Sequence, residues 1–290
     1  MSTVRGGTSS LLRVLTYHRV AEPGDAPDLD PMLVSATPDA FRKQMVHVRK
    51  RYQPVTLSQV SEAFLEGRPL PPRAVHVTVD DAYRDFAECS WPILMELDIP
   101  VTVFVPTAYP AEPSRALWWD RLHRVNVRDS GDAWRRAARS AVEAYEATTP
   151  RPVGHDPDIR AWLRALPHDG AARFVENTCR EAGLQEVDDA PKSPAVLSWD
   201  ELRGLARQGV AFGAHTRHHV ALAGFDESRV RGEIRGSLAD LTRELGHGPW
   251  PIAYPYGTYD RTVMRIAGEE GCTLGFTSDD GLSRPGRTHP

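Results

Sequence analysis

Short apolar segments of strand length recur along this 290-residue chain, and most of them end at polar residues. They are rich in β-branched residues, which favour buried strands. Between them, apolar residues recur at helical spacing. Strands that alternate with helices predict βαβ units and a parallel sheet. The expected strands are 11–16, 74–79, 100–105, 210–214, 251–254 and 273–277, and the expected helices are 38–51, 58–65, 86–97, 228–245 and 261–270, with one more after Ser198.

Two of these helices have a candidate N-terminal cap. Ser198 is followed three residues later by Glu201, which is the pattern of a capping box. Ser58 could cap the helix at 58–65, although Glu62 lies four residues on and leaves the register open. Ser198 therefore predicts the residue at which its helix starts. For the helix at 58–65 the sequence predicts the helix but not its first residue.

A segment of different composition, at about 108–194, interrupts the alternation of strands and helices. Proline clusters at 106–113 and 191–194 enclose it, and its first part is rich in Ala, Arg and Glu, with Trp134 and Tyr145 in a helical pattern. We interpret it as a helical insertion. The expected organisation is a single domain over residues 1–290, in which 11–107 and 196–281 form the α/β body.

Composition excludes several classes of protein. Lysine plus arginine number 35 and aspartate plus glutamate 39, so the formal net charge of −4 does not favour nucleic acid or an anionic membrane. No window approaches 18 consecutive apolar residues, and residues 1–20 lack the features of a signal peptide. The three scattered cysteines fit buried thiols in a reducing compartment. We therefore expect a cytoplasmic protein; peripheral membrane association and oligomeric state remain open.

Polar residues lie just past the carboxyl ends of four of the predicted strands. They are His18, the pair Asp80 and Asp81, His215, and Tyr256. In barrels of parallel strands, the carboxyl ends of the strands meet at the face where active sites are built. The sequence therefore predicts one site to which all four segments contribute.

The same residues offer a set of metal ligands. His215 and His219 are four residues apart, a spacing that lets two imidazoles on one helical turn bind one transition metal. His218 is a competing partner, because a spacing of three also allows chelation. One carboxylate from Asp80 or Asp81 would complete a two-His, one-carboxylate set with open positions for water and substrate. Side chains alternate along a strand, so Asp80 and Asp81 would point to opposite faces of the sheet. Both can face the site only if the backbone bends immediately after Asp80.

Three segments together resemble the polysaccharide deacetylase (NodB homology) domain of carbohydrate esterase family 4. The family's Thr-Phe-Asp-Asp-Gly motif corresponds to residues 78–82 (TVDDA), and its His-Ser/Thr-x-x-His motif is intact at 215–219 (HTRHH). Its Arg-x-Pro-Tyr motif corresponds to 253–256 (AYPY). The resemblance covers about 11–107 and 196–281. It implies a distorted (β/α)7 barrel, here with a helical insertion.

The resemblance also implies the chemistry of the site. Asp80 corresponds to the catalytic base, and Asp81, His215 and His219 correspond to the ligands of one divalent metal, usually Zn²⁺, with Co²⁺ or Ni²⁺ as alternatives. The backbone N–H of Tyr256 corresponds to an oxyanion donor. Hydrolysis of an amide needs a Lewis acid on its carbonyl oxygen, an activated water and a base that takes the water's proton. The residue types agree with these requirements.

The chain departs from the family pattern in three places. Ala82 replaces the motif glycine, so we expect the turn after Asp81 to form without a positive φ. Ala253 replaces the arginine that pairs with the base. The family's Asp…Trp motif and late histidine are not found after residue 257, and His289 is a weak candidate. We assign the general acid instead to His18, since histidines titrate near neutral pH; the alternative is that it only orients a neighbour.

The sequence thus predicts a metal-dependent hydrolase that removes an N-acetyl or O-acetyl group from an amino sugar or glycoconjugate. Trp119, Trp199 and Pro255 are candidate contacts for the carbohydrate, and Trp118 is a further possible stacking platform, although large aromatics more often belong to a core. Two alternatives remain: a non-catalytic carbohydrate-binding domain on the same fold, and a metal-dependent hydrolase of a non-sugar amide.

Overall fold

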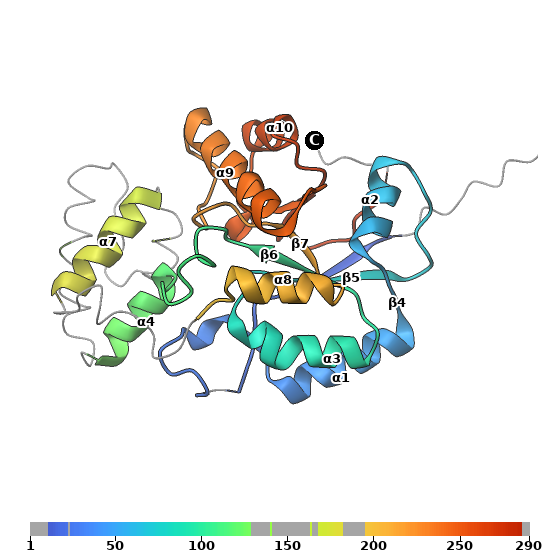
Figure 1. Cartoon of the computed structure of the whole chain (residues 1–290), viewed down its shortest axis with the longest axis horizontal. Coiled ribbons are helices and arrows are strands. Elements are labelled where there is room, and N and C mark those ends of the chain that lie inside the picture. Colours follow the sequence, from blue (N-terminus) through green and yellow to red (C-terminus); the bar gives the residue numbers. More distant parts are fainter. Residues whose placement is uncertain are drawn as a thin grey trace, which may run out of the picture.

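A parallel sheet forms the centre of the structure, a computed structural model (Figure 1) that describes residues 11–22, 24–128, 168–181 and 195–285, with residues 140 and 163. The sheet has seven strands, and every pairing between them is parallel. The strands are β1 (Arg13–Tyr17), β4 (Gln53–Pro54), β5 (Ala74–Val79), β6 (Val101–Val105), β7 (Ala211–Ala214), β8 (Ile252–Ala253) and β9 (Gly275–Phe276).

The order of the strands is β1-β5-β6-β7-β8-β9, and β4 also pairs with β5. Every residue of β5 and of β6 is buried, as expected for parallel strands covered on both faces. Within the described ranges no pairing joins β9 to β1. Instead, Ser283 forms an antiparallel bridge with Leu12. The sheet is thus a distorted, incompletely closed barrel, which confirms the expected fold class.

Helices cover the sheet on both sides. In Figure 1, α1 (Pro38–Arg51), α3 (Trp91–Glu96) and α8 (Trp199–Arg207) lie below it, and α9 (Glu227–Leu245) and α10 (Arg261–Glu269) lie above it. The helix α2 (Leu57–Leu65) covers one end, and α4 (Trp118–Arg128) and α7 (His168–Glu181) pack together at the other. Among the short elements, β2 (Arg19–Val20) pairs with β3 (Val34–Ala36), and η1 (Pro31–Leu33) and η3 (Pro255–Gly257) are 3₁₀ turns.

The helix starts show where local signals were sufficient. Ser198 and Glu201 form the expected capping box at the start of α8. Helix α2 is capped two residues before Ser58. Thr56 Oγ1 accepts the N–H of Gln59, and the Gln59 side chain accepts the N–H of Thr56. The expected helix at 86–97 begins as a π-helical turn over Phe86–Ser90 and continues as α3.

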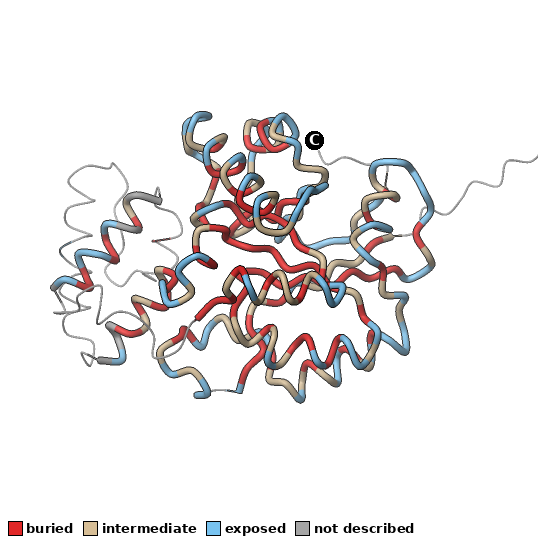
Figure 2. Tube along the Cα trace, in the orientation of Figure 1, coloured by how far each residue is buried: buried red, intermediate tan, exposed pale blue. Residues whose placement is uncertain are grey.

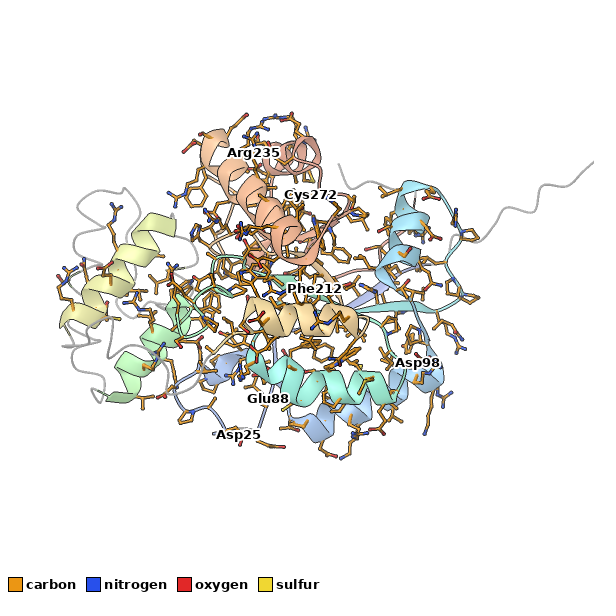
Figure 3. All side chains as sticks on the ribbon, viewed as in Figure 1. Asp25, Glu88, Asp98, Phe212, Arg235 and Cys272 are labelled. Atoms are coloured by element: carbon orange, nitrogen blue, oxygen red, sulfur yellow. The ribbon has the colours of Figure 1, made fainter. Side chains whose placement is uncertain are left out.

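The main hydrophobic core lies between the sheet and the inner faces of the surrounding helices. Figure 2 shows this as buried strands within a partly exposed shell of helices. Figure 3 shows Phe212 of β7, which is 4% exposed, beside α8, while Arg235 extends from α9 and pairs with Glu270 (Nε–Oε2 2.7 Å). The buried strand thus carries an apolar side chain where the solvent face of α9 carries a charged one.

Parts of the expected insertion, including the pattern at 134–145 and the proline cluster at 191–194, lie outside the described residues, as does His289. Within the described part of the chain, no helix combines the length and the apolar composition that a membrane span needs. The division into one body and one insertion remains a prediction.

A buried histidine in β5 predicts a pH effect on stability. His76 is fully buried; its Nδ1 lies 2.8 Å from the carbonyl oxygen of Val55 and its Nε2 3.0 Å from Thr102 Oγ1. Burial lowers the pKa of His76 from 6.5 to about 4, although the bond to Val55 opposes this. In the unfolded chain His76 takes up a proton near pH 6.5, whereas in the folded protein it stays neutral down to about pH 4. The unfolding free energy is therefore unaffected by this group above pH 6.5 and decreases as the pH falls from 6.5 toward 4.

We therefore expect His76→Gln, which cannot titrate, to change the pH dependence of unfolding. Between pH 7 and pH 4.5 the wild type should lose about 2–3 kcal/mol of unfolding free energy relative to the variant. Urea denaturation of both proteins at the two pH values measures this difference. If the difference in unfolding free energy between wild type and variant is the same at both pH values, then His76 is protonated in the folded state or accessible to water.

Candidate active site

A sharp turn directly after β5 presents the two aspartates. Asp81 has a φ of 70° and Ala82 a φ of 53°, so the backbone bends immediately after Asp80. The expectation that the turn avoids positive φ was therefore wrong: Ala82 takes the left-handed conformation of the motif glycine. This costs roughly 1–2 kcal/mol for a residue with a Cβ. Complete burial of Ala82 in the main core helps to hold the strained turn.

The residues 215–219, here called the motif loop, follow β7. They do not form the helical turn that we expected. Positive φ values at Thr216 (60°) and His219 (56°) reverse the chain instead, and the Thr216 hydroxyl accepts the N–H of Val220 (3.1 Å). The two histidines still face the same way, because the rings of His215 and His219 have centroids 4.7 Å apart.

Asp81, His215 and His219 form the one cluster in the described residues whose donor atoms suit a metal ion. One donor atom from each lies within 4.8 Å of the others, and all three residues are buried. Nε2 of His219 lies 3.1 Å from Asp81 Oδ1, and Nε2 of His215 lies 3.7 Å from it. Apart from these contacts, both oxygens of Asp81 are buried without a hydrogen-bond partner in the described part of the chain. Two imidazole nitrogens and an unsatisfied carboxylate are a donor set that fits a divalent transition metal.

Hydrogen bonds at the other ring nitrogens orient both histidines. His215 Nδ1 lies 2.9 Å from the carbonyl oxygen of Ala253, and His219 Nδ1 lies 3.2 Å from the Tyr256 hydroxyl. A metal-binding histidine commonly uses its second nitrogen in this way. Burial lowers the pKa of His215 to about 3, and His219 acts in the same direction. Although burial opposes it, His219, with His18 and His215, holds the pKa of Asp81 below its ordinary value.

The structure separates His218 from this cluster. Its Nδ1 lies 2.8 Å from Glu233 Oε1 on α9, and its side chain is 37% exposed. Bonds from His218 and Arg217 hold the pKa of Glu233 below its ordinary value, although burial acts to raise it. Of the two spacings that the sequence allowed, four residues rather than three brings both histidines to Asp81.

Asp80 lies beside the cluster without belonging to it. It is 8% exposed, and its Oδ1 has no hydrogen-bond partner among the described residues. Burial raises the pKa of Asp80 to about 7, with Asp81 adding to the shift and His18 opposing it. The charge of His18, which is half-buried after β1, also lowers the pKa of Asp81 and of His215.

Aromatic side chains from α4 contact the site, because the carboxyl ends of the strands face that helix (Figure 1). The ring of Trp119 has its centroid 4.7 Å from that of His219. The indole N–H of Trp118 donates to the Tyr256 hydroxyl (2.7 Å). Trp118, a possible stacking platform in the sequence, is thus bonded to a residue of the site.

A buried polar chain holds Trp119 in place. Its indole N–H donates to the Tyr83 hydroxyl (2.7 Å), which donates to Asp120 Oδ2 (2.7 Å), and Asp120 Oδ1 accepts the N–H of Asp30 (2.7 Å). Burial raises the pKa of Asp120 to about 7. Tyr83 is the residue directly after the turn formed by Asp81 and Ala82. These hydrogen bonds therefore link α4 to that turn. Trp119 is only 6% exposed, so its ring supports His219 and offers little surface for a sugar.

The other two candidate substrate contacts are also buried. Trp199, on α8, is 7% exposed and packs in the main hydrophobic core. Pro255 is buried in η3, where its carbonyl oxygen accepts the N–H of Thr258 (3.1 Å). The structure therefore does not bring Trp199 to the site, and it leaves Tyr256 as the residue of η3 that contacts His219.

Comparison with known sequences finds similarity to polysaccharide deacetylases. The profile of the family described as polysaccharide deacetylase matches residues 171–275, which include the motif loop. Over 87 residues, 30% of this chain, the sequence is 34% identical to the poly-beta-1,6-N-acetyl-D-glucosamine N-deacetylase of Escherichia coli K12, of which the match covers 12%. The putative polysaccharide deacetylase YxkH of Bacillus subtilis is 23% identical over 87 residues, 30% of this chain and 31% of that protein. The matches thus span less than a third of either relative.

Comparison with solved structures covers nearly the whole chain. The deacetylase PplD of Streptococcus pyogenes, solved with acetate, superimposes with a TM-score of 0.61 at 18% identity, over 96% of this chain and 88% of that one. IcaB from Ammonifex degensii gives the same TM-score at 19% identity, over 96% and 88%. At these identities the likeness concerns the fold, and it agrees with the distorted parallel barrel.

Proposed function

We propose that the chain is a polysaccharide deacetylase, as the family profile over residues 171–275 supports. It would hydrolyse the N-acetyl group of an amino sugar in a carbohydrate polymer or glycoconjugate, with one divalent metal, most simply Zn²⁺. The observation that carries the proposal is the buried cluster of Asp81, His215 and His219. These three residues would hold the metal, and Asp80 lies next to them as a carboxylate outside the ligand set. A bound cation would supply the Lewis acid that polarises the acetyl carbonyl.

In this proposal the protein residues move the protons. Asp80 takes a proton from the attacking water, because its buried carboxylate lies beside the ligands without joining them. The backbone N–H of Tyr256 donates to the oxyanion that develops on the carbonyl oxygen. His18 then protonates the leaving amine, since an amide anion is too basic to depart. Its electrostatic influence on Asp80 and Asp81 supports this position.

Acetate release tests the proposal. Wild type loaded with Zn²⁺ should release acetate from β-1,6-linked N-acetylglucosamine oligomers, the sugar named for the E. coli relative, or from β-1,4-linked ones. Treatment with a chelator should abolish the release, and added Zn²⁺ should restore it. Binding of the oligomers without acetate release would instead support a carbohydrate-binding domain. Release only from N-acetylated amino acids would support a hydrolase of non-sugar amides.

His18→Ala tests the general acid. The variant should keep its fold and its metal while kcat falls by about 10², and the alkaline limb of the pH–rate profile should flatten or move. His47→Ala is a matched control, because His47 is exposed on α1. A loss of about threefold or less with an unchanged alkaline limb would leave His18 an orienting residue.

A further inference from the structure

We propose that Glu233 of α9 is a positioning residue that holds the motif loop in its metal-binding conformation and thereby sets the affinity for the metal. The inference rests on the proposed metal site and adds a residue from outside the family motifs. The Glu233 side chain comes from a helix that contributes no ligand to the cluster. It is 8% exposed and faces the motif loop.

One carboxylate satisfies three polar groups of the loop. Oε2 of Glu233 accepts the backbone N–H of Arg217 (3.1 Å) and that of His218 (3.0 Å). Its Oε1 lies 2.8 Å from His218 Nδ1. Hydrogen bonds that involve a charged group are roughly twice as strong as neutral ones. Because Arg217 and His218 lie between the two ligands, their positions determine how His215 and His219 face each other.

The loop needs such support because its backbone is strained. Thr216 and His219 both adopt positive φ, which costs a residue with a Cβ roughly 1–2 kcal/mol. Strained conformations persist only where the surrounding structure over-determines them. On the other side of the loop, the carbonyl oxygens of Thr216 and Arg217 accept the N–H groups of Thr107 (3.2 Å) and Ala108 (2.8 Å). Glu233 therefore supplies the second half of a clamp on the loop backbone.

The same face of α9 is fitted to the loop at two further positions. Asp240 Oδ2, two helical turns after Glu233, accepts both the Thr107 hydroxyl (3.0 Å) and Arg217 Nε (3.1 Å). Between them, a Cβ added to Gly236 would lie 3.0 Å from Arg217 Cδ, so this helix surface closely matches the arginine stem. Of these three positions on α9, Glu233 is the one whose side chain bonds the loop backbone directly, so the proposal concerns that residue.

The dissociation constant for Zn²⁺ tests the inference independently of catalysis. It is measured on metal-free, folded protein by competition with a chromophoric chelator, alongside thermal melting. We expect Glu233→Ala to weaken Zn²⁺ binding by about 10–100-fold, the usual effect of removing a partner that orients the ligands. Glu233→Gln should recover most of the loss, because its amide oxygen can accept both backbone N–H groups. Glu227→Ala, on the same helix but exposed, should bind Zn²⁺ like wild type.

A merely structural role would lower the melting temperature without changing the dissociation constant of the folded protein. A Glu233→Ala protein that binds Zn²⁺ within about threefold of wild type would therefore overturn the inference. If that variant does not fold, Glu233→Asp serves instead: it keeps the charge but is one methylene shorter, and wild-type affinity would contradict the role equally. A wild type that binds no Zn²⁺ would overturn the metal site itself, and is distinguishable from failure of the positioning role alone.

Discussion

Asp80→Asn should retain one equivalent of bound metal while kcat falls by a factor on the order of 10² or more. The amide keeps the size of the carboxylate and can still accept a hydrogen bond, but it cannot take the proton of the attacking water. Metal analysis of the purified variant and the rate of acetate release at saturating substrate measure the two effects separately.

The control for this experiment is Asp39→Asn, which removes an exposed carboxylate on α1 that pairs with Lys43. It should leave both kcat and metal content unchanged. Near-normal turnover by a metal-loaded Asp80→Asn protein would exclude Asp80 as the base. Loss of the metal from that variant would mean that Asp80 binds the ion, contrary to the separation from the ligand set that we infer.

His219→Ala should lose the metal and, with it, the activity. Removal of one of three protein ligands should weaken binding by more than about 100-fold, the upper range for losing a residue that only orients a ligand. Metal content after dialysis against metal-free buffer measures this. The matched control is His47→Ala, because His47 is exposed on α1. His218→Ala should keep most of the metal, because it removes only the contact to Glu233 Oε1 and leaves both backbone bonds to Glu233 in place. One equivalent of metal in His219→Ala, or its loss from His218→Ala alone, would show that the ligand pair is wrongly assigned.

The parts of the fold that local patterns could predict are those with long, uniform segments. The apolar segment at 74–79 coincides with β5, and the helical spacing at 38–51 coincides with α1. By contrast, β4 has only two residues, Gln53 and Pro54, and neither has a strong strand preference. Its pairing with β5 is a tertiary contact that no local pattern records.

The site shows the same division. The alternation of strands and helices predicted that the pair Asp80 and Asp81 and the histidines of the motif loop lie at one site. The choice of Asp81 over Asp80 as the ligand came from the family resemblance. The backbone of the motif loop could not be anticipated, because positive φ at Thr216 and His219 depends on bonds from other elements. The missed Glu233 did leave a signal: it lies at the spacing of the buried residues Val230 and Ile234, where an acidic side chain needs a partner.

The buried His76 and Asp120 have a joint consequence for proton linkage. Folding releases a proton from His76 between pH 4 and 6.5, because its folded pKa of about 4 lies below the unfolded value of 6.5. Folding takes up a proton at Asp120 between pH 3.8 and 7, because its folded pKa of about 7 lies above 3.8. In the shared window the two changes have opposite signs, so their contributions to the pH dependence of unfolding nearly cancel. The summed contribution of these two buried groups to the unfolding free energy therefore stays almost constant in mild acid, although each group alone would make it depend on pH.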